Sequence, residues 1–250
     1  MSESLDLVHR SIEQHAEGSS STRRKFVTGA AATVGGAALL GTFPKLARAS
    51  GNNNVQTILN VAATAEVLAT IVNTVGAQRQ LGGDTVTQTN IEAAAREELI
   101  HYQVLVGTYG AVPVTKTIWV PDAVFASRTN LLQTLVAGDQ IFVNAYLIGV
   151  SCFCTQGNGA LATVPAEFMG TEAVHRALAL QSLGQLGNDR VFMHVDFTDI
   201  LDAVTRLQTA GFGFGAEGAK PGRFYDFDKV SKHTPNPAGL NTLTPTPITC

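Results

Sequence analysis

Glutamate and histidine stand three residues apart at two places in the chain, in segments that read AREELIHY and GTEAVHRA. The pairs are Glu98 with His101 and Glu172 with His175. Residues i and i+3 of an α-helix lie on one face, so the carboxylate and the imidazole of each pair can reach the same metal ion. Carboxylate and imidazole ligands together suit iron or manganese.

Both pairs fall on the apolar side of a helical stretch. The shared stripes contain Ile91, Ala94, Ala95, Tyr102 and Leu105 around the first pair, and Phe168, Leu178 and Ala179 around the second. Burying a carboxylate without a partner costs several kcal/mol, so such groups persist when they are paired or bound to a metal. Two metal ions between the helices would satisfy all four side chains.

Two further carboxylates complete the pattern. Glu66 and Asp139 are each the single acid within an apolar helical stretch. The predicted metal ligands are therefore Glu66, Glu98, His101, Asp139, Glu172 and His175. Asp139 reaches one methylene less far than a glutamate, and its neutral neighbours Gln140 and Asn144 point toward other faces. The alternative is a metal-free bundle of helices whose buried acids are paired or protonated.

Other polar residues near the predicted ligands are expected to serve the fold. Glu92 and Glu97 are interpreted as solvated surface charges, which is the usual place of glutamate. Tyr102 and Tyr146 are interpreted as core aromatics, with a hydrogen bond to the site as the lesser alternative. His194 lies in an irregular segment and is interpreted as structural.

Apolar residues at helical spacing predict the elements that position these side chains. The first two predicted helices cover about 54–75, with Gly76 as the stop, and 91–110, capped by Asn90 or Thr87. The next two cover at least 127–150, and 165–184 with Pro165 near the first turn. A shorter fifth helix covers 196–211, capped by Asp196 or Thr198 and ended by Gly211. The stretch 110–122 is extended. This order predicts an all-α four-helix bundle with one long crossover.

The two ends of the chain differ from this domain. Residues 1–49 read as a twin-arginine signal, with Arg23 and Arg24 before a short apolar run and a small-x-small cleavage site at its end. The run is too short and glycine-rich for a membrane span, and no stable span is expected elsewhere. The domain is placed at 50–210. Residues 211–250 form a Gly/Pro/Thr-rich extension, expected to be irregular and to wrap on the domain through aromatic residues.

Charge and cysteine content limit the partners. The chain has 17 Lys+Arg and 20 Asp+Glu; residues 1–49 hold six of the former and four of the latter, so the mature net charge is −5. A nucleic-acid binder is excluded on this ground.

A disulfide from Cys152 or Cys154 to Cys250 is compatible with export. The C-x-C spacing by itself is a weak zinc signal.

Four stretches carry a resemblance to a known family: AEVLA around Glu66, EELIH, AGDQIFVNAYLIG around Asp139, and TEAVH. Together they resemble the ferritin-like di-metal carboxylate superfamily, in particular the exported branch that includes desiccation-related proteins. The resemblance implies that Glu98 and Glu172 bridge two iron or manganese ions, that Glu66 and Asp139 are terminal ligands, and that His101 and His175 bind one ion each. Asp139 stands where the family usually has glutamate.

The resemblance also implies a function. The expected activity is an oxidoreductase reaction with peroxide or oxygen, such as peroxide disproportionation or ferroxidase chemistry, in stress protection at the periplasm, the cell envelope or outside the cell. The alternative is a non-catalytic envelope or desiccation-related protein that keeps the bundle, with or without metal. Iron storage, which needs a closed shell, is a third and weaker reading. An oligomer is compatible with the sequence.

Overall fold

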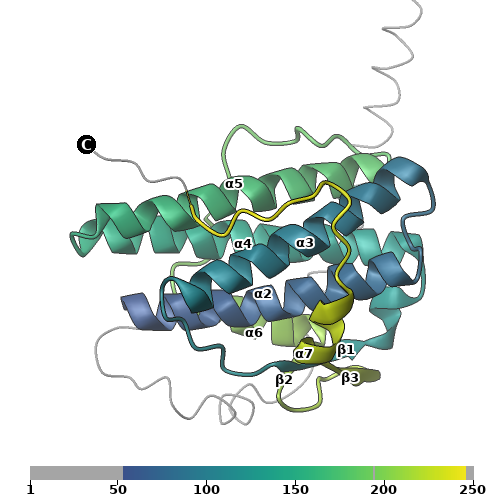
Figure 1. Cartoon of the computed structure of the whole chain (residues 1–250), viewed down its shortest axis with the longest axis horizontal. Coiled ribbons are helices and arrows are strands. Elements are labelled where there is room, and N and C mark those ends of the chain that lie inside the picture. Colours follow the sequence, from purple (N-terminus) through teal and green to yellow (C-terminus); the bar gives the residue numbers. More distant parts are fainter. Residues whose placement is uncertain (1–52, 194, 246–250) are drawn as a thin grey trace, which may run out of the picture.

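The computed structural model describes residues 53–193 and 195–245, so the predicted signal segment 1–49, His194 and Cys250 lie outside the described residues. The fold is mostly helical, with a small three-stranded sheet at one side (Figure 1). The helices are α2 (Val55–Gln78), α3 (Thr85–Gly107), α4 (Arg128–Thr155), α5 (Gly159–Ser182), α6 (Leu201–Ala210) and the single turn α7 (Phe227–Val230), with 3-10 turns η2 (Asp122–Phe125) and η3 (Ser231–His233).

The four long helices pack side by side (Figure 1). α2 packs along α3 and α4 packs along α5, and the two pairs meet where α2 contacts α4 and α3 contacts α5. Each of the four helices carries one buried carboxylate among those predicted as ligands. The packing therefore brings four acids from separate parts of the sequence into one interior.

The second helix begins earlier than predicted. α3 starts at Thr85, and its N-cap is Asp84, whose Oδ1 accepts the Thr87 backbone N–H at 2.9 Å. Neither Asn90 nor Thr87 is the cap, and the helix ends at Gly107 instead of Gly110. The β-branched threonines weakened the local helical signal, but the aspartate cap satisfies the first-turn N–H groups and extends the helix.

Gly76 does not stop α2, which continues to Gln78. The reason lies in the neighbouring helix, because a Cβ built on Gly76 would come within 2.6 Å of Leu131 Cδ2. Leu131 on α4 is fully buried. The glycine thus leaves room for the buried Leu131 side chain between α2 and α4 and does not end the helix.

We expect Gly76→Ala to destabilise the protein by about 1–2 kcal/mol, because the added methyl overpacks the contact with Leu131. Gly170→Ala in α5 is the matched control, since a Cβ there meets no atom of the described residues within 4 Å. It should stabilise by roughly 0.4–1 kcal/mol, as alanine usually does in a helix. Urea unfolding of both variants measures the difference, and a stabilised Gly76→Ala protein would contradict the packing role.

Two other helix starts differ from the predictions. α5 begins six residues before Pro165, which lies inside the helix and packs against Gly149 of α4, where a Cβ would lie 3.1 Å from the proline Cβ. α6 begins at Leu201, whose backbone N–H donates to Asp199 Oδ1 at 2.9 Å, so neither Asp196 nor Thr198 caps it. Gly211 ends α6 in the left-handed conformation as predicted.

The crossover and the C-terminal extension form a sheet that an all-α prediction did not include. The strands are β1 (Thr117–Pro121), β2 (Gly213–Phe214) and β3 (Gly222–Asp226), with β1 in the centre. Both outer strands run antiparallel to β1, and Trp119 pairs with Gly213 on one side and with Phe224 on the other. The extension is thus partly regular, and its last described part returns over α3, where Arg96 Nε donates to the Leu240 carbonyl at 2.9 Å (Figure 1).

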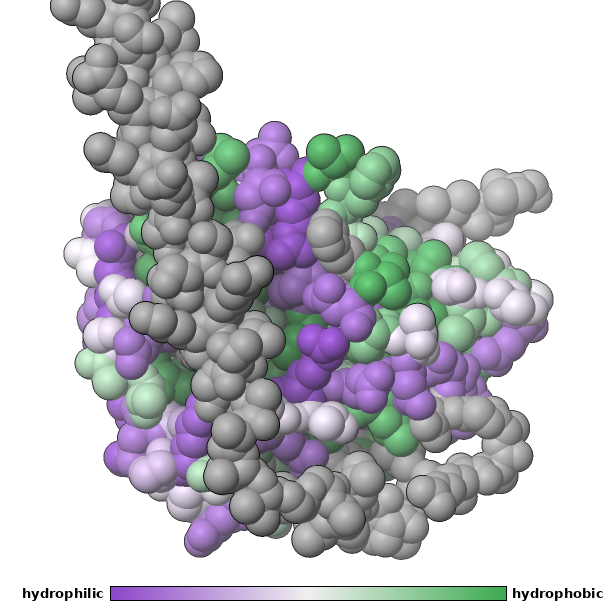
Figure 2. Space-filling model, turned by 180° about the vertical axis from the view of Figure 1, so that it is seen from behind, coloured by the Kyte–Doolittle hydropathy of each residue, from purple (hydrophilic) through white to green (hydrophobic). Residues whose placement is uncertain are grey.

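By length and composition α2 and α4 could each cross a membrane, contrary to the expectation that no segment beyond the N-terminal run could. In the fold, 78% of the most apolar window of α2 is buried, whereas only 39% of that of α4 is buried. Both helices also carry a buried carboxylate, Glu66 and Asp139. On the face seen in Figure 2, hydrophobic residues gather in patches among hydrophilic ones. Packing on several sides accounts for the apolar content of α2. Two helices of this length and composition are by themselves weak evidence for a membrane span.

Two cysteines lie in the last turns of α4. Cys152 is half-buried and Cys154 is exposed, and neither forms a disulfide within the described part of the chain. The predicted disulfide to Cys250 involves a residue outside the described part of the chain.

Candidate metal centre

Four of the six predicted ligands form one compact group. Glu66, Glu98 and Glu172 are fully buried and His101 is 6% exposed. One oxygen or nitrogen from each lies within 4.8 Å of the corresponding atom of the other three. These side chains come from α2, α3 and α5, and the group could hold a metal ion.

His101 occupies one side of this group. Its Nδ1 lies 3.5 Å from Glu172 Oε1, 3.6 Å from Glu98 Oε2 and 3.7 Å from Glu66 Oε1. These separations are longer than hydrogen bonds. Two ligand atoms that share an ion at about 2.1 Å lie roughly 3–4 Å apart, so the spacing suits a common ion better than a shared proton.

His175 occupies the opposite side. Its Nδ1 lies 3.2 Å from Glu98 Oε1 and 3.6 Å from Glu172 Oε2. Each of the two glutamates therefore points one oxygen at His101 and the other oxygen at His175. This division of the oxygens defines two neighbouring positions, one on each side of the Glu98–Glu172 pair.

Asp139 lies near the second position and outside the compact group. It is 5% exposed on α4, and with His175 it lines a small space of about 20 Å³. That volume is enough for one water molecule. The structure thus places Glu66 with His101 on one side, and Asp139 with His175 on the other.

Most ligand atoms of these six residues lack hydrogen bonds. Within the described residues, buried atoms without a hydrogen-bond partner include Glu66 Oε2, both oxygens of Glu98 and of Glu172, Asp139 Oδ2, and the Nδ1 atoms of His101 and His175. Buried polar atoms in folded proteins are normally paired, and a bound ion can take the place of a hydrogen-bond partner. Carboxylate and imidazole donors in this number fit a metal site.

Burial and mutual repulsion make it unfavourable for the four carboxylates of the cluster to be ionised together without bound protons or cations. Burial, and then the charge of Glu98, raise the pKa of Glu66 to about 8. Burial, and then the charge of Glu172, raise the pKa of Asp139 well above its usual range. Burial alone would lower the pKa of both imidazoles, but the surrounding carboxylates outweigh it and raise the pKa of His101 and His175. The cluster therefore favours bound protons or bound cations.

Glu97 is not a solvated surface charge, as its type had suggested. Its side chain is 32% exposed, and its Oε2 lies 2.5 Å from His175 Nε2. Burial alone would raise the pKa of Glu97, but the hydrogen bond and charge of His175 outweigh it and lower that pKa. When Nε2 carries the proton toward Glu97, the Nδ1 lone pair points into the centre. The sequence signal that pointed to Glu97 was its position directly before the predicted ligand Glu98.

We expect Glu97→Gln to weaken metal binding roughly 10- to 100-fold, because a carboxylate behind a ligating histidine fixes its orientation and raises its basicity. Glu92→Gln is the control on the same helix, since the Glu92 carboxylate accepts a hydrogen bond from Gln88 Nε2 at 2.8 Å and is not one of the centre's residues. Titration of each variant with Fe²⁺ or Mn²⁺ measures the affinity. Equal affinities for the two variants would contradict a role of Glu97 at the centre.

Aromatic residues enclose the His101 side. The Tyr146 hydroxyl donates a short hydrogen bond to Glu66 Oε1. This tyrosine therefore makes the hydrogen bond to the site that was the lesser alternative to a purely core role. Phe168 stacks on the His101 ring with centroids 4.0 Å apart. Tyr102 instead packs on Phe227, with ring centroids 4.4 Å apart.

Two further polar residues hold the surroundings in place. Arg176 is 2% exposed and makes a bidentate contact with Asp189, at 2.8 and 2.9 Å. Asn144 donates to the Phe197 carbonyl at 2.9 Å and accepts the Asp196 backbone N–H. Asn144 therefore ties α4 to the segment before α6 and does not face the centre, as expected.

No protein-family model, curated protein or solved structure matches the chain. The buried group of carboxylates and imidazoles is thus the main observation that bears on function.

Proposed function

We propose that the chain is a ferritin-like di-metal carboxylate protein, built on a four-helix bundle with one long crossover, whose centre holds two iron or manganese ions. The observation that carries the proposal is the division of the Glu98 and Glu172 oxygens between two imidazoles. A carboxylate placed in this way can bridge two ions. Helices that each supply a carboxylate, two of them with a Glu-x-x-His pair, are the pattern of such centres.

The remaining ligands divide evenly between the two proposed positions. Glu66 and His101 would complete one position, and Asp139 and His175 the other. Asp139 has the shortest reach, and the water-sized space that it lines with His175 leaves room for a small molecule there. The second position is therefore the one we propose to be open.

Two redox-active ions, when bound, supply electrons to peroxide or oxygen, which is the chemistry that we propose for this site. The protein orients the ligands. Tyr146 holds the Glu66 carboxylate by donating a hydrogen bond from its hydroxyl, and Glu97 orients His175 by accepting a hydrogen bond from its Nε2. Phe168 covers the His101 ring.

The proposed setting is outside the cytoplasm, after export by the twin-arginine route, in protection against oxidative or desiccation stress. This part rests on the sequence of residues 1–49 and on the family resemblance.

A non-catalytic envelope or desiccation-related protein with the same helices is the second candidate. The raised pKa values of Glu66 and Asp139 favour it, since protons can compensate the buried acids when no metal is bound. In that case the cluster would serve only the fold.

Metal analysis of protein purified after native export tests the proposal. We expect about two ions of iron or manganese per chain. A chain without bound metal, whose melting temperature is unchanged by a chelator, would contradict it. Peroxide consumption by the metal-loaded protein then separates the two candidates, since only the first predicts turnover.

A further inference from the structure

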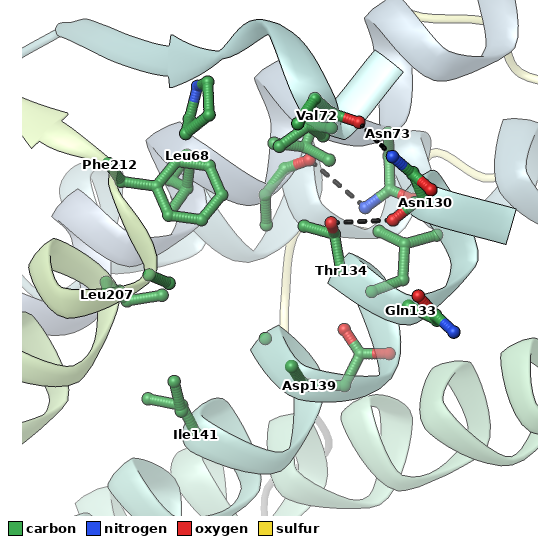
Figure 3. A pocket seen from close by; sticks show the side chains of 18 of the residues that line it. Leu68, Val72, Asn73, Asn130, Gln133, Thr134, Asp139, Ile141, Leu207 and Phe212 are labelled. Carbon is green, nitrogen blue, oxygen red and sulfur yellow. Dashed lines mark hydrogen bonds between the residues drawn. The ribbon is translucent and has the colours of Figure 1, made fainter. Parts of the chain in front are cut away.

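A cavity of about 190 Å³ lies between α2, α4 and α6, next to the proposed metal centre (Figure 3). Its walls are mainly apolar and include Leu68, Val72, Phe142, Leu207 and Phe212. Figure 3 shows Leu207 and Phe212 on one side and Asn73, Asn130 and Thr134 on the other. An apolar cavity of about 150 Å³ can take one benzene ring, so this cavity has room for a single ring with a substituent.

Among the described residues, two side chains in the wall have a buried acceptor atom without a hydrogen-bond partner, Asp139 and Asn73. Asp139 is already assigned to the proposed metal centre, which leaves the Asn73 amide for a ligand in the cavity. Asn73 is 2% exposed, and its Nδ2 donates to the Ala69 carbonyl at 3.2 Å. Its Oδ1 has no hydrogen-bond partner in the described part of the chain. A buried amide oxygen without a partner is costly, and a ligand that donates a hydrogen bond would satisfy it.

The cavity lies between solvent and the metal centre. Gln133 and Lys220 in its lining are exposed, so it opens to solvent at that end. Asn73 and Asp139 line both this cavity and the water-sized space beside His175. A molecule in the cavity would therefore sit against the Asp139 side of the centre.

From these observations we infer that the cavity is a binding site for a small single-ring organic molecule of about the size of phenol, which carries a hydroxyl or amine that donates to Asn73 Oδ1. The apolar walls select the ring, and the amide oxygen selects the donor. This inference goes beyond the proposed function and does not depend on it, because the walls and Asn73 are part of the fold whether or not metal is bound.

Calorimetric titration of the full chain with phenol and with benzene tests the site. We expect both to bind, with phenol favoured about fivefold, the ratio that one hydrogen bond supplies. Asn73→Leu removes the acceptor at similar volume, and it should abolish the preference for phenol while benzene still binds. Absence of phenol binding, or an unchanged preference in Asn73→Leu, would overturn the inference.

A second variant tests the location. Gly138 lines the cavity, and a Cβ on it meets no atom within 4 Å in the part of the chain that the structure describes. We therefore expect Gly138→Leu to fill the space and weaken phenol binding at least tenfold. Gly170→Leu, which also adds a side chain in open space within a helix, should leave binding within twofold of wild type. Equal phenol affinities in the two variants would place the binding elsewhere. If Gly138→Leu does not fold, the Asn73→Leu result alone decides.

Discussion

Glu98→Ala should remove both metal ions at once. Each oxygen of Glu98 faces a different imidazole, so the change removes one ligand atom from each proposed position and leaves a cavity between them. We expect the metal content to fall from about two ions per chain to near zero. At a hundredfold excess of metal over Kd, bound metal stabilises a protein by about 2.7 kcal/mol. The melting-temperature difference of roughly 5–10 °C between metal-loaded and chelator-treated wild type should therefore vanish in the variant.

Glu92→Ala on the same helix is the control, and it should keep both the metal content and the response to chelator. Glu98→Gln keeps the shape of the side chain and separates loss of a ligand from loss of packing. Retention of two ions by Glu98→Ala would rule out the bridging role, whereas loss in Glu92→Ala as well would point to a general folding defect.

The metal-free protein should lose stability as the pH rises from about 4.5 to 8. Glu66 has its folded pKa raised from 4.5 to about 8, so the folded state binds more protons than the unfolded state throughout this range. The raised pKa of Asp139 acts in the same direction. The raised pKa values of His101 and His175 add stability that is present below 6.5 and is lost as the pH rises through their folded pKa. One proton of difference corresponds to about 1.4 kcal/mol per pH unit.

Urea unfolding of chelator-treated protein at several pH values between about 5.5 and 7.5 measures this slope. Glu66→Gln should flatten it, because the glutamine cannot release a proton. Saturating metal should reverse the trend, since metal binding needs deprotonated ligands and strengthens as the pH rises. Stability that increases with pH in the metal-free wild type would show that the cluster does not retain its protons.

Residue spacing and local composition were enough to predict the six candidate metal ligands. Glu-x-x-His depends only on helix geometry, and a single acid in an apolar stripe depends only on local composition, so both are visible without a fold. The same local signals predicted four long helices, and the structure confirms a mostly helical protein. The predicted helix starts were less accurate. The start of α3, for example, depends on one hydrogen bond from the Thr87 backbone N–H to the Asp84 side chain, which helix propensities do not include.

Contacts between distant segments were decided by the tertiary structure. Glu97 reads as a surface residue until His175, 78 positions away, meets its carboxylate. Gly76 reads as a helix stop until Leu131 occupies the space that a Cβ would need. The sheet likewise requires β1 in the crossover to meet β3 more than a hundred residues later.

What the sequence by itself determined is therefore the set of metal-ligand candidates and the helices that carry them, since both depend on spacing within one turn or one helix. Only the tertiary structure decided how the oxygens of Glu98 and Glu172 divide between two imidazoles. It also decided that an apolar cavity reaches Asp139 from outside. These features depend on the packing of several helices, and no local pattern encodes the distances between them.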